Sequence, residues 1–198
     1  MFADFLKVIA LFIFPLLLTS VFHHFVVIKR NLWQSLTFPV DFGGTINGER
    51  IFGPTKTFRG FVVTIVGASL VTYLTYPLLS TPNVVFYVPS WLIGALLGLG
   101  YSIGELPTSF LKRRFDIAPS QQVGGAKGVF FYLLEQVDSV ATAVIVALLI
   151  SNIPISTGII LFTMGSGFHV SIDAILYVGG YKKKLDRPLL LRKLLTRK

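Results

Sequence analysis

Residues 104–138 read GELPTSFLKRRFDIAPSQQVGGAKGVFFYLLEQVD, and this stretch leaves one apolar segment and enters the next. Acids lie within sequence that otherwise suits hydrocarbon, and a basic cluster lies between them: Glu105, Glu135 and Asp138, with Lys112, Arg113 and Arg114. An unpaired carboxylate is costly in lipid, so such acids usually face a partner, an ion or a water-filled cavity. The stretch therefore predicts two membrane helices that form a site for metal and phosphate near a membrane boundary.

The composition is that of a membrane protein. The chain has 198 residues, of which 53% are hydrophobic and only 14% charged, whereas a soluble domain carries about 25% charged residues. The absence of cysteine excludes disulfides, thiolate metal sites and a cysteine nucleophile. The net charge of +9 comes from bases that flank apolar segments, so it favours membrane orientation over nucleic-acid binding.

Five apolar segments are each long enough to cross a bilayer, which takes about 20 residues. Their predicted bounds are about 5–28, 60–79, 86–111, 128–150 and 155–180. Only helices and closed barrels satisfy their backbone in lipid, and these runs are too long for barrel strands. We therefore expect an all-α integral membrane protein with five transmembrane helices. It forms one membrane domain over residues 1–198, with loops 29–59 and 112–127 and a basic tail 181–198.

The positive charges predict the orientation. The two loops and the tail contain every Lys and Arg except Lys7, and the connections 80–85 and 151–154 contain none. By the positive-inside rule, both loops and the C-terminus are cytoplasmic and the N-terminus is outside. We therefore expect a multi-pass protein of the cytoplasmic membrane, with a site that faces the cytoplasm.

The acids of three different helices lie at one depth. At about 1.5 Å per helical residue, Glu105 lies roughly 10 Å from the cytoplasmic boundary, and Glu135 and Asp138 roughly 10–15 Å. Asp173 lies at a similar depth, whereas His169 is interpreted as a helix-packing residue. Oxygen ligands without cysteine favour a hard cation such as Mg²⁺. The alternative is that the acids pair with Lys or Arg, or relay protons in a transporter.

The first loop is rich in turn signals, such as Gly43-Gly44 and Asn47-Gly48, and it ends in Thr55-Lys56-Thr57-Phe58-Arg59-Gly60. Free backbone N–H groups at a helix start, beside Lys and Arg, form an anion site. A helix cap with a positive-inside anchor is an equally good interpretation. The Walker pattern GxxxxGK[ST] is absent, so ATP binding of that type is not predicted.

Several pieces of the chain together resemble the CDP-archaeol synthase family, a branch of the membrane CTP-dependent lipid cytidylyltransferases that includes CDP-diacylglycerol synthase. The pieces are PVDFGG (39–44), NGERIFGPTKTFRG (47–60), GELPTSFLKRR (104–114), EQVDSV (135–140) and GFHVSIDAILYVGGYKK (167–183). The resemblance covers most of the chain in the same order. It implies that a lipid phosphate attacks the α-phosphorus of CTP, with pyrophosphate as leaving group and a CDP-activated lipid as product.

The resemblance also implies roles for particular residues. The catalytic cations would be Lys56, Arg59, Lys112 and Arg113, and the nucleotide-phosphate site would comprise Lys56, Thr57, Arg59 and Lys112. The ligands of Mg²⁺ would be Glu105, Glu135 and Asp138. The family usually has Asp where this chain has Glu105 and Glu135. The partners would be CTP, membrane lipids and a lipid phosphate, either archaeol-phosphate-like or phosphatidate-like.

Other interpretations stay open from the sequence alone. A small transporter would use the intramembrane acids as a relay, and a non-catalytic membrane homologue of the enzyme would explain the two Glu positions. A lipid kinase is a closer rival. A five-helix chain with polar membrane residues could also form a homodimer.

Overall fold

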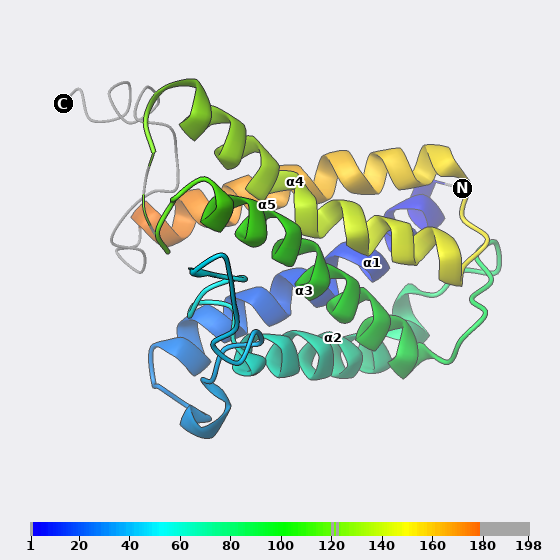
Figure 1. The fold of residues 1–198 in the computed structure, drawn as a ribbon. Helices are drawn as coiled ribbons and strands as arrows, with labels where there is room; N and C mark the ends of the chain where they lie inside the picture. The colour runs from blue at the N-terminus through cyan, green and yellow to red at the C-terminus, as the bar shows by residue number, and fades with distance from the viewer. Residues whose placement is uncertain (1, 120, 122, 179–198) are drawn as a thin grey trace.

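A computed structural model describes residues 2–119, 121 and 123–178 (Figure 1). Within that range, the side chains at positions 173, 174 and 176–178 are also outside the description. The predicted carboxylate of Asp173 and the predicted basic tail 181–198 therefore lie outside the described residues.

The described chain is helical apart from one short hairpin. The long helices are α1 (Phe2–Phe22), α2 (Phe58–Leu79), α3 (Ser90–Arg114), α4 (Gly125–Ile150) and α5 (Ile155–Val178). A π-helix, η1 (His23–Ile28), continues α1, and a short 3₁₀ turn, η2 (Gln34–Leu36), follows it. Strands β1 (Thr45–Ile46) and β2 (Glu49–Arg50) pair antiparallel. Asn47 and Gly48 between them both have positive φ, as a type I′ turn requires, so the turn predicted there is confirmed.

The five predicted helical segments are present in the predicted order, but some ends differ. The third begins at Ser90 rather than near 86, because Pro89 disfavours helix in the residue before it. It continues to Arg114 rather than ending at 111, which places the three basic residues in its last turn, where the helix dipole favours them. The fourth begins at Gly125 rather than near 128.

Four helical spans of the described chain are long and apolar enough to cross a membrane: Phe2–Ile28, Phe58–Leu79, Gly125–Ile150 and Ile155–Ile172. These spans indicate a multi-pass membrane protein. α3 is not among them. It lies between α2 and α4 and contacts both, and glycines, hydroxyl residues and charged residues interrupt its apolar sequence.

α3 presents small residues to both neighbours. A Cβ atom on Gly98 would lie 2.6 Å from the Thr64 carbonyl of α2, and one on Gly104 would lie 2.7 Å from the Asp138 carbonyl of α4. Glycine at such positions lets helix backbones approach closely in membranes. The close approach at Gly104 brings the next residue, Glu105, beside α4.

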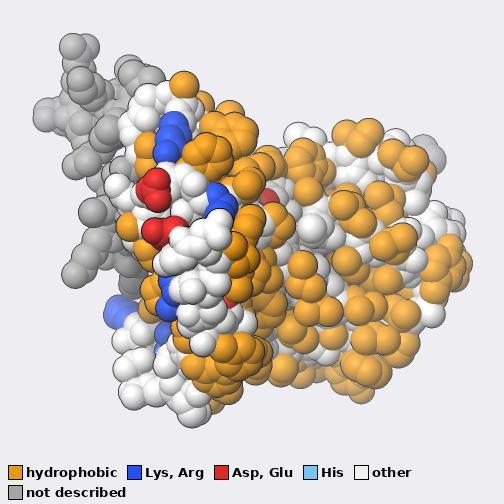
Figure 2. Space-filling view, viewed as in Figure 1, with side chains coloured by type: hydrophobic (Ala, Val, Ile, Leu, Met, Phe, Trp, Pro, Cys, Tyr) orange, Lys and Arg blue, Asp and Glu red, His pale blue; other side chains and the backbone are white. Residues whose placement is uncertain are grey.

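The helices alternate in direction, so the two long loops meet at one end of the bundle and the short connections lie at the other (Figure 1). Figure 2 shows the acidic and basic side chains gathered at the loop end, with an apolar surface over the rest of the visible face. An apolar core that includes Val8, Phe12, Ile93, Leu97 and Ala147 holds the opposite half together.

Candidate functional site

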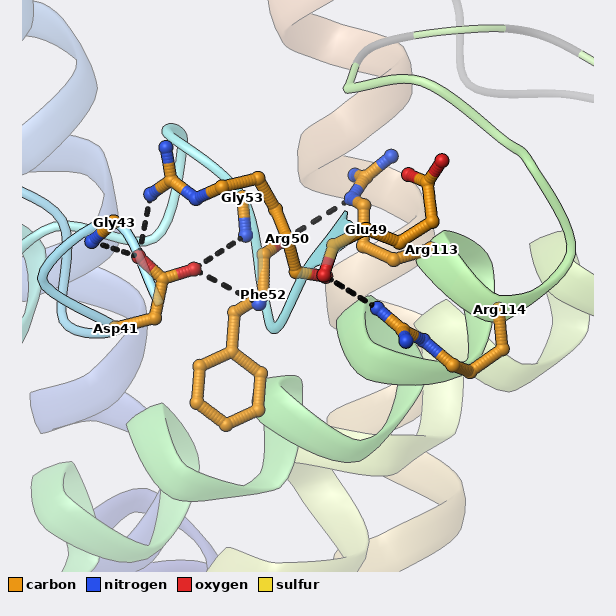
Figure 3. Close-up of polar contacts among 8 residues, drawn as sticks. All are labelled: Asp41, Gly43, Glu49, Arg50, Phe52, Gly53, Arg113 and Arg114. Carbon is orange, nitrogen blue, oxygen red and sulfur yellow. Dashed lines mark hydrogen bonds and ion pairs between the residues drawn. The ribbon is translucent and has the colours of Figure 1, made fainter. Parts of the chain in front are cut away.

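The first loop is folded around the buried carboxylate of Asp41 (Figure 3). This carboxylate accepts hydrogen bonds from the backbone N–H groups of Gly43, Phe52 and Gly53 at 3.1, 3.0 and 2.9 Å, and from the Arg50 guanidinium at 2.5 Å. Burial disfavours the charged form, but these donors outweigh it and hold the pKa of Asp41 well below its ordinary value. The charged carboxylate of Asp41 therefore holds several parts of the first loop together and determines the path of its backbone.

Two arginines at the end of α3 attach this loop to the helices (Figure 3). Arg114 donates hydrogen bonds of 2.6–3.0 Å to three carbonyls of the β1–β2 hairpin: Ile46, Glu49 and Arg50. Arg113 is buried and donates to the carbonyl of Phe52 at 3.3 Å and to the carbonyl of Ile117. Both arginines hold backbone oxygens of the loop. The sequence placed Arg114 in a basic cluster beside a metal and phosphate site but did not predict its contact with the hairpin.

Two ion pairs link the loop, α3 and α4. Lys56, just before α2, pairs with Glu105 of α3, and Lys112 of α3 pairs with Glu135 of α4. Each of these four side chains keeps between 16% and 36% of its surface exposed, so both pairs remain accessible to a ligand. Pairing with lysine was the alternative to metal binding, and it is the arrangement found for these two glutamates.

Asp138 has a different environment. Its carboxylate accepts hydrogen bonds from the backbone N–H and the hydroxyl of Ser139 at 2.6 and 2.9 Å, and it lies within electrostatic reach of Glu105. Among the described residues, no Lys or Arg forms an ion pair with it. Asp138 thus lies beside the two lysine-glutamate pairs without a cation of its own.

The helix cap that the sequence predicts at the start of α2 is present. The Thr57 hydroxyl accepts a hydrogen bond of 3.4 Å from the backbone N–H of Gly60. Arg59 extends to the turn after η1, where it donates to the side chain of Asn31 at 3.3 Å and to the carbonyl of Leu32 at 3.1 Å. The first turn of α2 is therefore tied to the end of the α1–η1 segment.

An apolar pocket of about 70 Å³ lies between α1, α3, α4 and α5. Its wall includes Leu16, Val140, Ala143 and Gly165, and Tyr101 and His169 also line it. The rings of Tyr101 and His169 pack edge to face at 6.2 Å, which agrees with the packing role predicted for His169. Tyr101 also lies within electrostatic reach of Glu105 and Asp138. Tyr101 therefore lines the pocket and also lies near the acidic part of the site.

Comparison with known proteins identifies the family. The CDP-archaeol synthase family matches residues 5–185. The chain belongs to this family. Curated CDP-archaeol synthases that it resembles include those of Pyrococcus furiosus (30% identity over 145 residues), Thermofilum pendens (36% over 126) and Archaeoglobus fulgidus (33% over 115). These alignments cover 70%, 63% and 55% of this chain and 78%, 53% and 60% of the relatives. No solved structure matches the chain significantly.

Family membership confirms the resemblance drawn from the sequence motifs, and it favours a CTP-dependent lipid cytidylyltransferase over a transporter. The site residues that the sequence predicts come from the first loop, α2, α3 and α4. The first loop and the ends of these helices that carry the predicted site lie at one end of the bundle (Figure 1). Lys56 meets Glu105 there, and Lys112 meets Glu135. The described residues contain no group of three His, Asp or Glu close enough to hold a metal ion.

Some residues at the loop end of the bundle were not predicted from the sequence to belong to the site. Asp41 lies in the PVDFGG piece, and an Asp that accepts from the backbone two residues later is a known turn signal that could have marked it. Tyr101 and His23 carried no signal, because an isolated aromatic residue or histidine in an apolar helix is usually a packing residue. Only the folded chain shows that both lie within electrostatic reach of Glu105.

Proposed function

We propose that this chain transfers the cytidylyl group of CTP to a membrane lipid phosphate. An oxygen of the lipid phosphate attacks the α-phosphorus, the bond between that phosphorus and the bridging oxygen to the β-phosphorus breaks, and pyrophosphate leaves. The products are a CDP-activated lipid and pyrophosphate. Membership of the CDP-archaeol synthase family carries this proposal, and the site at the loop end of the bundle supplies the groups that the chemistry needs.

The two lysine-glutamate pairs suit a Mg²⁺–CTP complex. Such a complex brings phosphate oxygens for Lys56 and Lys112 and a cation for Glu105 and Glu135. Both ion pairs can therefore exchange partners without leaving a charge unpaired, which would be costly in a partly buried site. Group transfer at phosphorus depends mainly on positioning and charge stabilisation, so these lysines carry most of the catalysis that we assign to side chains.

The donor chemistry of the acids fits Mg²⁺. Glu105, Glu135 and Asp138 offer only carboxylate oxygens, which are the ligands that Mg²⁺ prefers, and it commonly takes one or two carboxylates with substrate phosphates. Asp138 supports this assignment because it lies near Glu105 and has no cationic partner among the described side chains. When bound, the metal would supply charge stabilisation at the phosphates.

The remaining predicted residues have positioning or phosphate roles in this proposal. Thr57 caps α2 and Arg59 lies in its first turn, whose N–H groups and dipole favour an anion. Arg113 acts indirectly, because its guanidinium is engaged with the carbonyls of Phe52 and Ile117 and so holds the loop that presents Lys56. The apolar pocket beside Tyr101 would receive part of a lipid chain.

The membrane arrangement is also a proposal. α3 would be the fifth transmembrane helix, packed between α2 and α4, and residues 1–198 would form one membrane domain. The N-terminus would be outside and the C-terminus and both loops in the cytoplasm, because the loops carry the positive charge. The site would then face the cytoplasm, where CTP is present. The homodimer stays a prediction.

The test is turnover by the purified protein in detergent with Mg²⁺ and CTP, with an archaeol-type lipid phosphate and a phosphatidate offered separately. We expect one pyrophosphate for each CDP-lipid formed, and no turnover in the presence of a chelator. Lys56→Gln and Lys112→Gln should each lower kcat/KM by about 10²-fold or more. Lys7→Gln, in the first turns of α1 at the opposite end of the bundle, is the control. If no pyrophosphate were released with either lipid, the proposal would be contradicted.

A further inference from the structure

The last turn of the first helix is not α-helical. η1 spans His23–Ile28 as a π-helix, and the backbone N–H of Leu32 closes a five-residue step to the carbonyl of Val27 just after it. π-helical turns are rare and occur frequently at functional sites. This turn sets the direction in which His23 leaves the helix, next to the first turn of α2.

The ring of His23 lies beside Gly60, in the first turn of α2. Its Cε1 atom lies 3.7 Å from the place where a Cβ atom of Gly60 would be, so the ring rests against the start of α2. It is also within electrostatic reach of Arg59 and Glu105. Because Arg59 is bonded to the turn that follows η1, the ring and the first turn of α2 are held in a fixed relation.

The neighbouring histidine is oriented differently. Nδ1 of His24 lies 3.0 Å from the carbonyl of Ser20 in its own helix. The two rings meet edge to face at 5.7 Å, but within the described part of the chain no hydrogen bond engages the ring of His23. A neutral imidazole always has one N–H donor and one acceptor nitrogen, so His23 has a donor to offer beside an anion-favouring helix start.

We propose that His23 is a substrate-binding residue of the CTP site, whose ring N–H donates a hydrogen bond to a phosphate oxygen held at the start of α2. The inference rests on the proposed function. The ring of His23 has no hydrogen-bond partner among the described residues, and a hydrogen bond to a charged oxygen is stronger than one to a neutral group. His23 thus adds α1–η1 to the elements that build the nucleotide site.

The test compares His23→Ala with His24→Ala. CTP binding is measured by calorimetry in detergent with Mg²⁺ and without lipid phosphate, and KM is measured for CTP and for the lipid phosphate. His23→Ala should weaken CTP binding and raise the KM for CTP by about 10- to 100-fold. The KM for the lipid phosphate should not change. His24→Ala should change CTP affinity by less than about twofold.

A third variant separates binding from structure. His23→Gln keeps a side-chain N–H donor, so we expect it to recover part of the CTP affinity lost in His23→Ala. Equal CTP affinity in His23→Ala and His24→Ala would overturn the inference. The inference would also be overturned if His23→Ala and His23→Gln lost CTP affinity equally and both had a lowered Tm. A wild-type protein that does not bind CTP would instead refute the proposed function itself.

Discussion

Asp41 is the single residue on which the first loop depends most, because one carboxylate satisfies three backbone donors and a guanidinium. Asp41→Asn removes the negative charge and one of the two strong acceptors. Loss of charged hydrogen bonds in a buried site costs about 1–3 kcal/mol. We expect faster proteolysis within residues 29–57 and weaker CTP binding. Asp116→Asn, at an exposed acid of the second loop, is the control, and equal protease resistance in both variants would contradict this role.

The low pKa of Asp41 gives this effect a defined pH dependence. A carboxylate with a lowered pKa in the folded state stabilises the fold above the unfolded pKa of about 3.9, and that contribution is lost as the pH falls towards the folded pKa. The difference in loop stability between wild type and Asp41→Asn should therefore be constant from pH 8 to pH 5 and shrink below about pH 4. Proteolysis with an acid-active protease across this range measures it.

Exchange of ion-pair partners at Lys56 has a counterintuitive consequence. Glu105→Gln removes the anion that neutralises Lys56, so the lysine is free to attract the triphosphate. Because partly exposed pairs contribute about 0.2–1 kcal/mol, CTP should bind roughly two- to fivefold more tightly in EDTA. Turnover with Mg²⁺ should nevertheless fall. Calorimetry and turnover assays check both results, and weaker binding in EDTA would contradict the proposed exchange.

The partners of these lysines could not be predicted from the sequence. Glu105 and Glu135 were recognised as site residues because acids are rare in apolar segments. Lys56 and Glu105 are separated by 49 positions, however, and their meeting depends on how α2 and α3 pack. Asp138 was predicted alongside them, but only the folded chain shows that it has no cationic partner among the described residues.

Among the helices, α3 has the most demanding packing. At Gly104 a Cβ atom would lie 2.7 Å from the Asp138 carbonyl and 1.9 Å from the Thr142 hydroxyl. Gly104→Ala should force α3 and α4 apart, lower stability by about 1–3 kcal/mol and displace Glu105 from Asp138. Thermal unfolding in detergent and CTP turnover both report this change.

Gly167→Ala is the matched control for this substitution. A Cβ atom there meets nothing within 4 Å, and alanine is favoured over glycine in a helix by about 1 kcal/mol. Its Tm should therefore stay the same or rise. If Gly104→Ala had as high a Tm and as much activity as Gly167→Ala, the close approach of α3 and α4 would not be needed for the site.

The helices themselves were predictable, because long apolar runs without charge leave few alternatives in a membrane protein. The end of α3 was not, since Lys112, Arg113 and Arg114 were taken as the residues after the helix and instead form its last turn. The β1–β2 hairpin was also missed. Its two-residue strands carry no alternating pattern, and only Asn47-Gly48 signalled the turn.

The protein as a whole places both long loops at one end, and charge predicts that this end is cytoplasmic. Because the chain has no cysteine, single cysteines can report its orientation. Asn83→Cys lies in the exposed connection between α2 and α3, and Thr45→Cys lies in the exposed β1–β2 hairpin. In intact cells an impermeant maleimide should label Asn83→Cys alone, and Thr45→Cys only after permeabilisation. The reverse pattern would contradict the proposed orientation.

The central claim is cytidylyl transfer, and the fate of each phosphorus atom of CTP tests it most directly. The purified protein is supplied with Mg²⁺, an archaeol-type lipid phosphate and CTP labelled either at the α- or at the γ-phosphorus. We expect α-label in the lipid product and γ-label in released pyrophosphate, because the bond that breaks lies between the α- and β-phosphates. Lipid that carries γ-label would show phosphoryl transfer by a kinase, and lipid with neither label would contradict an enzymatic role for the site.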